Sequence, residues 1–124
     1  MAKIVIADDE ADILHLLTFL LRKHTLYQAT RGDQALQLVR EVMPDLTILD
    51  VMMPAMTGIE VMQHLTEDPA TASIPVMLLS AKGQATEVAE GSRSGARLYM
   101  VKPFNHKQLL EAINGLLDER IKSG

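Results

Sequence analysis

Five short apolar runs, separated by segments with helical spacing of apolar residues, constrain the fold of this chain more than any other feature. The runs cover residues 3–7, 25–30, 46–50, 75–79 and 98–101. The intervening segments predict helices over residues 10–23, 31–43, 59–66, 84–94 and from Asn105 onward. Strands that alternate with helices form a parallel sheet covered on both faces and joined by right-handed crossovers. We therefore predict an α/β fold with a doubly wound, five-stranded parallel sheet.

Two of these segments are weaker than the others. Residues 25–30 alternate poorly, which favours a strand at the edge of the sheet. Residues 84–94 carry Val88 as their single bulky apolar side chain, so any helix there is loosely held. In the first helix, Phe19 falls outside the apolar arc and is a candidate partner contact, although one exposed apolar residue is commonplace.

The composition indicates one ordinary globular domain. The chain has 124 residues, 48% of them apolar and 23% charged, with a net charge of −4 and no cysteine. Lysine and arginine are scattered, which argues against direct binding of nucleic acid. The sequence contains neither the pattern of a signal peptide nor an apolar run long enough to span a membrane. We expect a cytoplasmic protein without membrane contact.

Polar residues follow the predicted strands in a pattern that indicates a functional edge. Asp8 and Asp9 follow the first strand, Asp50 ends the third, and Ser80 and Lys102 follow the fourth and fifth. Because the carboxyl ends of parallel strands meet at one edge, we expect these groups to converge there. Crowded carboxylates favour a hard divalent cation, above all Mg²⁺, with Mn²⁺ as an alternative. With a lysine beside it, such a pocket suits an anion such as a phosphoryl group.

Each of these residues also has a purely structural interpretation. Asp8 and Asp9 are suitable acids for a helix N-terminus, and Asp50 for a turn. Ser80 alone is more often structural than functional, and Lys102 could be a solvated strand end. The presence of all these groups at successive strand ends is what the structural interpretations explain poorly.

The chain resembles the response-regulator receiver domain of two-component signalling, over residues 3–120. The matching motifs are Asp8-Asp9-Glu10, Asp50 with residues 53–58 (Met-Pro-Ala-Met-Thr-Gly), Ser80-Ala81, Gly95-Ala96, Tyr99 and Lys102-Pro103-Phe104. The resemblance implies a flavodoxin-like (CheY-like) three-layer sandwich with strand order 2-1-3-4-5. It also implies a receiver domain over residues 1–121, with residues 122–124 as a tail or the start of a linker.

The resemblance assigns the central chemistry to Asp50, which would be the phosphorylated residue. Asp8, Asp9, Asp50 and the main-chain carbonyl of Met52 would hold Mg²⁺. The protein would catalyse only its own phosphorylation and dephosphorylation, and so would not be an enzyme acting on other substrates.

The resemblance also assigns the residues that read the phosphoryl group. Ser80 would bind its oxygens by a hydrogen bond, Lys102 would pair with them, and Tyr99 would act with Ser80 as the switch. The Lys102–Pro103 bond is expected to be cis. The phosphoryl donor would be a sensor histidine kinase or a histidine phosphotransfer protein. An unknown output protein would bind the face made by the fourth helix, the fifth strand and the fifth helix.

Some positions depart from the family's pattern. Arg97 and Leu98 stand where many relatives have two acids, and Ala112 stands where an arginine pairs across one type of dimer. This disfavours that dimer and favours a stand-alone regulator, monomeric or weakly dimeric. The alternative is the receiver half of a larger regulator with a DNA-binding or enzymatic output. Neither Met52 nor Lys82 can orient an attacking water, so we expect a fairly long-lived acyl phosphate.

Two unrelated functions fit less well. A flavin-binding electron carrier usually has a Ser/Thr/Gly-rich phosphate loop where this chain has Asp8-Asp9-Glu10. A haloacid-dehalogenase-like phosphatase requires a second aspartate at position 52, which is methionine here. The four histidines show no metal-binding spacing and are expected to be solvated: His15, His24, His64 and His106.

Overall fold

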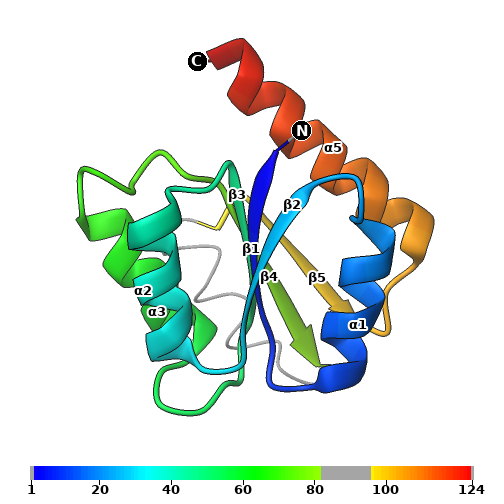
Figure 1. Cartoon of the computed structure of the whole chain (residues 1–124), viewed down its shortest axis with the longest axis horizontal. Helices are drawn as coiled ribbons and strands as arrows, with labels where there is room; N and C mark the ends of the chain where they lie inside the picture. Colours follow the sequence, from blue (N-terminus) through cyan, green and yellow to red (C-terminus); the bar gives the residue numbers. More distant parts are fainter. Residues whose placement is uncertain (1, 82–95, 124) are drawn as a thin grey trace.

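The computed structural model describes residues 2–81 and 96–123, which form a five-stranded parallel sheet with helices on both faces (Figure 1). The strands are β1 (Lys3–Ala7), β2 (Thr25–Ala29), β3 (Leu46–Asp50), β4 (Val76–Ala81) and β5 (Leu98–Lys102). The helices are α1 (Ala11–Leu20), α2 (Gly32–Val42), α3 (Gly58–Glu67) and α5 (His106–Ser123). The strand order is β2-β1-β3-β4-β5, which confirms the predicted fold class and order. The weakly predicted helix at residues 84–94 lies outside the described residues.

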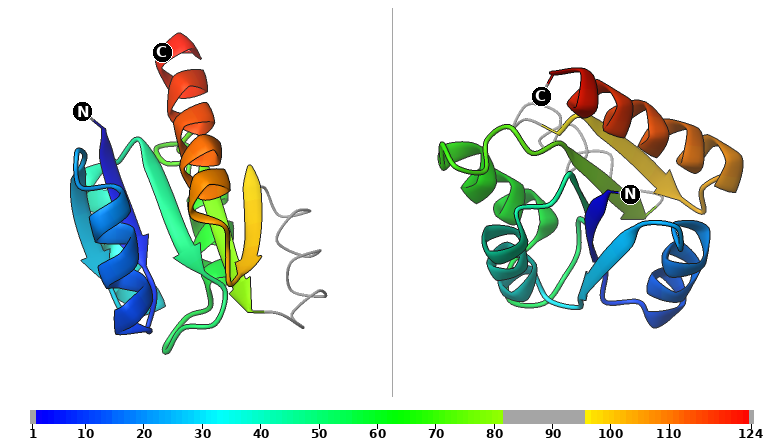
Figure 2. Two further views of the ribbon diagram at one scale, coloured as in Figure 1. Left: turned by 90° about the vertical axis from the view of Figure 1, so that its right-hand side faces the viewer. Right: turned by 45° about the horizontal axis from the view of Figure 1, so that its top comes forward.

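The helices cover the sheet in two pairs, and each pair closes one apolar core. Figure 2 shows α1 and α5 on one face of the sheet, with α2 and α3 on the other. The core under α2 and α3 includes Val39 and Met62, and the core under α1 and α5 includes Leu17 and Ile113. Every residue of β3 is buried, because β3 is the central strand and carries a core on each side.

Side-chain caps at the N-termini of α3 and α5 explain where these two helices begin. Thr57 and Glu60 form a reciprocal capping box at the start of α3, with bonds of 3.0 and 3.1 Å, which the sequence analysis did not identify. Asn105 caps α5 as predicted, because its Oδ1 accepts a hydrogen bond from the backbone N–H of Gln108 at 3.0 Å. α5 runs to Ser123, past the predicted boundary at residue 121, so Lys122 and Ser123 continue the helix.

Strands β4 and β5 are longer than predicted. β4 reaches Ala81 and β5 reaches Lys102, because the two strands remain paired as far as Ala81 and Lys102. Ser80 therefore lies within the last residues of a strand and not after it. The bond between Lys102 and Pro103 is cis, as expected.

Three residues that the sequence analysis singled out lie at or near the surface of the protein. Phe19 is 61% exposed, as expected, and the Arg22 guanidinium lies 4.4 Å from its ring centroid. Leu98, which stands where many relatives have an acid, is half-buried against the core under α1 and α5. Arg97 forms an ion pair with Glu119 of α5 at 3.1 Å.

His24 was predicted to be solvated, and this was wrong. It is half-buried, and its Nδ1 accepts a hydrogen bond from the backbone N–H of Ala2 at 3.2 Å. Burial, followed by the nearby charge of Lys23, lowers the pKa of His24. The other three histidines are exposed, as predicted: His15, His64 and His106.

Within residues 2–81 and 96–123, no helix combines the length and the apolar character that crossing a membrane requires.

We expect Thr47→Val to stabilise the protein by about 1 kcal/mol, because it removes a buried hydroxyl group that has no hydrogen-bond partner within residues 2–81 and 96–123. Thr47 lies in register between Val5 and Val76, so a valine suits its surroundings. Urea denaturation measures the change in the free energy of unfolding.

Thr71→Val is the matched control. The Thr71 hydroxyl is also buried, but it donates a hydrogen bond of 2.7 Å to the carbonyl oxygen of Leu65. We expect this variant to be destabilised by about 1 kcal/mol. A loss of stability in Thr47→Val equal to that of the control would contradict the assignment of an unpaired hydroxyl.

Candidate functional site

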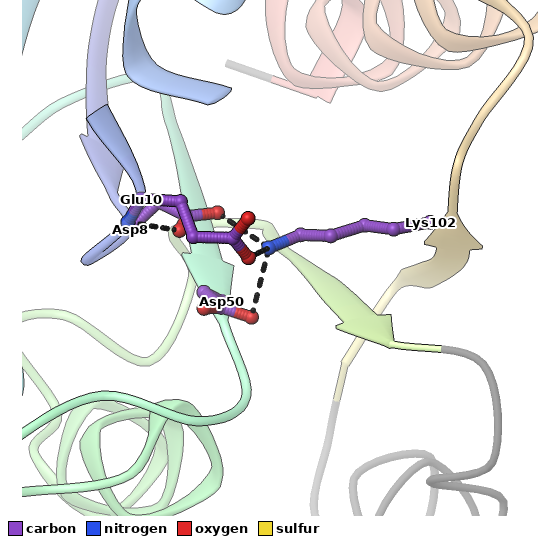
Figure 3. A network of polar contacts seen from close by, with 4 residues as sticks. All are labelled: Asp8, Glu10, Asp50 and Lys102. Atoms are coloured by element: carbon purple, nitrogen blue, oxygen red, sulfur yellow. Dashed lines mark hydrogen bonds and ion pairs between the residues drawn. The ribbon is translucent and has the colours of Figure 1, made fainter. Parts of the chain in front are cut away.

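The carboxyl ends of the strands bring the predicted acidic and basic residues to one edge of the sheet. Asp8 directly follows β1, Asp50 is the last residue of β3, and Lys102 is the last residue of β5. The strand register continues this alignment, since Asp50 pairs with Leu79 and Lys102 with Ala81. Figure 3 shows the Lys102 side chain extended toward the acidic groups that follow β1 and end β3.

A tight turn after β1 fixes the first acidic residues. The backbone N–H of Asp8 donates to the carbonyl oxygen of Ala29 at 3.1 Å, which continues the pairing of β1 with β2. The Oδ1 atom of Asp8 accepts a hydrogen bond from the backbone N–H of Glu10 at 2.9 Å. The Asp8 side chain is therefore buried and fixed, whereas Asp9 and Glu10 are exposed at the mouth of the site.

The loop after Asp50 is held close to the strand that carries it. The backbone N–H of Val51 donates a hydrogen bond to the carbonyl oxygen of Leu79 at 2.8 Å. The backbone N–H of Gly58 donates one to the carbonyl oxygen of Val51 at 2.8 Å. A Cβ atom at Gly58 would collide with the carbonyl oxygen of Asp50, so this position requires glycine. Ala55, at the tip of the loop, has a φ of 71°, in the left-handed region that glycine prefers.

A second glycine fixes the far side of the same loop. The backbone N–H of Gly32, at the start of α2, donates to the carbonyl oxygen of Pro54 at 3.1 Å. A Cβ atom at Gly32 would collide with the carbonyl oxygen of Met56. Contacts with β4 and α2 thus determine the path of the segment that carries Met52.

Lys102 forms the centre of the site. Its Nζ atom donates hydrogen bonds to Asp8 Oδ2 at 2.8 Å and to Glu10 Oε1 at 3.0 Å, and lies 3.4 Å from Asp50 Oδ1 (Figure 3). The side chain of Lys102 is 11% exposed and that of Asp50 is 6% exposed. One buried ammonium group therefore neutralises part of the charge of three carboxylates.

Burial and crowding dominate the electrostatics of the site. Burial and the neighbouring charge of Asp8 raise the pKa of Asp50 to about 7, although Lys102 opposes the shift. Burial alone would lower the pKa of Lys102, but hydrogen bonds to Asp8 and Glu10 outweigh it and raise that pKa above its usual value. Among the described residues, the acidic groups of the site thus carry more negative charge than Lys102 alone can balance.

The donor set fits a hard divalent cation. Asp8, Asp9, Glu10 and Asp50 each offer a carboxylate oxygen, and these atoms all lie within 4.8 Å of one another. Carboxylate oxygens are the ligands that Mg²⁺ and Mn²⁺ prefer, and a cation would relieve the repulsion that raises the pKa of Asp50. The sequence analysis assigned no role to Glu10, although the residue belongs to the acidic motif after the first strand.

Ser80 lies near the carboxyl end of β4, and Tyr99 lies near the start of β5. Ser80 is fully buried, and its hydroxyl has no hydrogen-bond partner among the described residues. Leu78 is in register with Tyr99, and Ser80 with Val101, so Ser80 and Tyr99 lie on the same face of the sheet. Tyr99 is 47% exposed. Their predicted roles in switching remain predictions.

The sheet order, the acidic edge and the lysine at the end of β5 define a receiver domain, and comparisons with known proteins agree. The family model of the response regulator receiver domain matches residues 4–114. The chain therefore belongs to the response regulator receiver family.

Two curated relatives are similar to this chain over nearly all of its length. The chain is 37% identical to Protein PilH of Pseudomonas aeruginosa over 119 residues, which cover 94% of this chain and 98% of that protein. It is 39% identical to the DNA-binding response regulator MtrA of Mycobacterium tuberculosis over 117 residues, which cover 93% of this chain but 50% of that protein. The chain thus spans nearly the whole of one relative and half of the other.

A solved structure confirms the fold. A CheY-like response regulator receiver domain protein from Methanospirillum hungatei superposes with a TM-score of 0.92 and 24% identity, covering 100% of this chain and 99% of that chain. At this level of identity the likeness concerns the fold alone.

We expect Asp50→Asn to stabilise the metal-free protein more at pH 8 than at pH 5, by about 2 to 3 kcal/mol. The folded protein raises the pKa of Asp50 from 3.8 to about 7, so it binds the proton more tightly than the unfolded chain does. The resulting penalty is absent below pH 3.8, grows as the pH rises, and is complete above pH 7. Denaturation at both pH values, with a chelator present, measures it.

Asp118→Asn, at an exposed position on α5, is the control, and should change the free energy of unfolding by less than about 0.5 kcal/mol at either pH. If Asp50→Asn stabilises the protein equally at pH 5 and pH 8, burial does not raise the pKa of Asp50 as described.

Proposed function

We propose that this receiver domain accepts a phosphoryl group on Asp50 from a sensor histidine kinase or a histidine phosphotransfer protein. The observation that carries the proposal is the position of the Lys102 ammonium, 3.4 Å from Asp50 Oδ1 and surrounded by carboxylates at the edge of the sheet. An ammonium beside a nucleophilic carboxylate is suited to neutralise the oxygens of an incoming phosphoryl group.

The reaction is an in-line transfer of the phosphoryl group from its donor to Asp50. A carboxylate oxygen of Asp50 attacks the phosphorus atom, and the bond from phosphorus to the donor atom breaks. The leaving group keeps the electron pair of that bond; with acetyl phosphate it departs as acetate. The product is an acyl phosphate on Asp50, and Lys102 compensates part of the charge on its oxygens. The protein acts in this way on itself, and we propose no catalytic activity toward other substrates.

Asp8, Asp9 and Asp50, together with the main-chain carbonyl of Met52, are the groups that would hold Mg²⁺ or Mn²⁺. Such a cation, when bound, supplies positive charge to the phosphoryl oxygens. Support for this set comes from the carboxylate oxygens, which lie within 4.8 Å of one another, and from the fixed path of the loop that carries Met52.

Signalling in this proposal begins at the hydroxyl of Ser80, which has no hydrogen-bond partner among the described residues. A buried hydroxyl without a partner gains a hydrogen bond when a phosphoryl oxygen comes within reach. Movement of Ser80 would open space on the face that it shares with Tyr99, and the half-exposed tyrosine would turn inward. The output protein would recognise the resulting change on β5, α5 and the segment that precedes β5.

We propose a stand-alone cytoplasmic regulator, monomeric or weakly dimeric, that contacts neither nucleic acid nor membrane directly. Two observations support it: the match to nearly the full length of PilH, and the absence of paired acids before Tyr99. The second candidate is the receiver part of a larger regulator with its own output domain. The match to half of MtrA, a DNA-binding response regulator, favours that alternative.

We expect incubation with acetyl phosphate and Mg²⁺ to add a single phosphoryl group to the protein, seen by intact-mass spectrometry. No adduct should form when Mg²⁺ is chelated beforehand, because the acidic groups then repel the anionic donor.

Asp50→Asn is the decisive variant and Asp118→Asn, at an exposed position on α5, is its charge-matched control. We expect no adduct in the first and a normal adduct in the second. A folded wild-type protein without an adduct, or an adduct that persists in Asp50→Asn, would refute the proposed chemistry.

The acyl phosphate should decay slowly. Met52 is 51% exposed near Asp50 and cannot orient an attacking water, so we expect Met52→Asn to accelerate decay about fivefold. Lys82→Glu should also accelerate decay, although Lys82 lies outside the described residues. The loss of the phosphoryl adduct over time, followed by mass, measures the three rates. Equal decay in all three proteins would show that these positions do not set the lifetime.

A further inference from the structure

Glu10 shares the ammonium group that the phosphoryl chemistry requires. Lys102 Nζ has three N–H donors, and the hydrogen bonds to Asp8 Oδ2 and Glu10 Oε1 use two of them. Asp50 is the most distant of the three carboxylates, at 3.4 Å against 2.8 and 3.0 Å. Lys102 is therefore held toward the acids that follow β1, and less closely to the predicted nucleophile.

We propose that Glu10 is a positioning residue that holds Lys102 toward the acids that follow β1 and thereby slows phosphorylation by small anionic donors. The inference rests on the proposed function, since it assumes that Asp50 accepts the phosphoryl group. It adds a residue that the sequence analysis left without a role, and it assigns to that residue a restraining effect.

Burial separates the two hydrogen-bond partners of Lys102. The side chain of Asp8 is fully buried, whereas that of Glu10 is 59% exposed. If Lys102 moved away from Asp8, a buried carboxylate would lose its compensating charge, which is costly. If Lys102 moves away from Glu10, water hydrates the exposed carboxylate instead. The bond to Glu10 is thus the one that can open and close at small cost.

The competition becomes sharper when a cation occupies the acidic group. Asp8 is a candidate metal ligand, and a carboxylate that binds a cation is a weaker partner for an ammonium group. Glu10 would then be the principal competitor with the phosphoryl oxygens for Lys102. A negative charge at the mouth also repels an anionic donor as it approaches.

The local backbone supports this positioning role. The N–H of Glu10 donates to Asp8 Oδ1 at 2.9 Å, so the turn that fixes the buried Asp8 also fixes the origin of the Glu10 side chain. From there the Glu10 side chain reaches Lys102, which comes from the other end of the chain (Figure 3). The contact therefore links the start of α1 to the end of β5.

The test compares Glu10→Gln with wild type in the rate of acetyl phosphate labelling at saturating Mg²⁺ and low ionic strength. The amide keeps the size of the side chain but removes its charge. We expect labelling of Asp50 to become about fivefold faster, within the range seen for coupled neighbouring groups. Glu67→Gln, at an exposed position on α3, makes the same change in net charge and should leave the rate unchanged.

A double-mutant cycle shows whether Glu10 acts through Lys102. In the Lys102→Met background, Glu10→Gln should change the slower labelling rate twofold or less. A second measurement does not depend on labelling: in the metal-free protein, NMR should show faster solvent exchange of the Lys102 ammonium protons in Glu10→Gln than in wild type.

The possible failures can be told apart. If wild type is not labelled on Asp50, the proposed function is wrong. If wild type is labelled and Glu10→Gln accelerates labelling equally with and without Lys102, the positioning role is refuted and the proposed function stands. The same conclusion follows if neither the labelling rate nor the ammonium exchange changes in Glu10→Gln.

Discussion

The placement of one ammonium group among buried carboxylates is the constraint on which the rest of the site depends. Lys102 contacts Asp8, Glu10 and Asp50, and these residues come from segments separated by up to 94 positions along the chain. Without the ammonium, Asp8 and Asp50 would be buried without compensating charge, which is strongly destabilising. Even with it, the pKa of Asp50 is raised to about 7, so part of the repulsion remains. That residual repulsion is what makes a cation favourable there.

The surrounding fold holds this arrangement in place. β3 is the central strand and is buried along its whole length, so Asp50 is carried by a strand that is packed on both faces. Gly58 and Gly32 bring the loop after Asp50 against β3 and α2, where larger side chains would collide with backbone carbonyl groups. The site therefore combines rigid support with excess negative charge, and a protein commonly accepts such a loss of stability where it gains function.

The residues proposed to carry the chemistry and the response lie on neighbouring strands of the same sheet. Asp50 ends β3, the buried hydroxyl of Ser80 lies near the end of β4, and Tyr99 lies on β5. In our proposal, the exposed Glu10 adds a restraint through its hydrogen bond to Lys102. A receiver domain built in this way can tune how readily it is phosphorylated through Glu10 without altering the residues that would carry the signal.

The sequence by itself determined the fold class, the strand order through the family resemblance, and the positions of Asp8, Asp50 and Lys102 at strand ends. These follow from the alternation of apolar runs and from the rule that parallel strands end at one edge. Only the tertiary structure decided that Lys102 contacts Glu10, that His24 is half-buried against Ala2, and that Leu98 packs into a core. Each of these depends on distances between segments far apart in the chain, and neither local periodicity nor residue type specifies such distances.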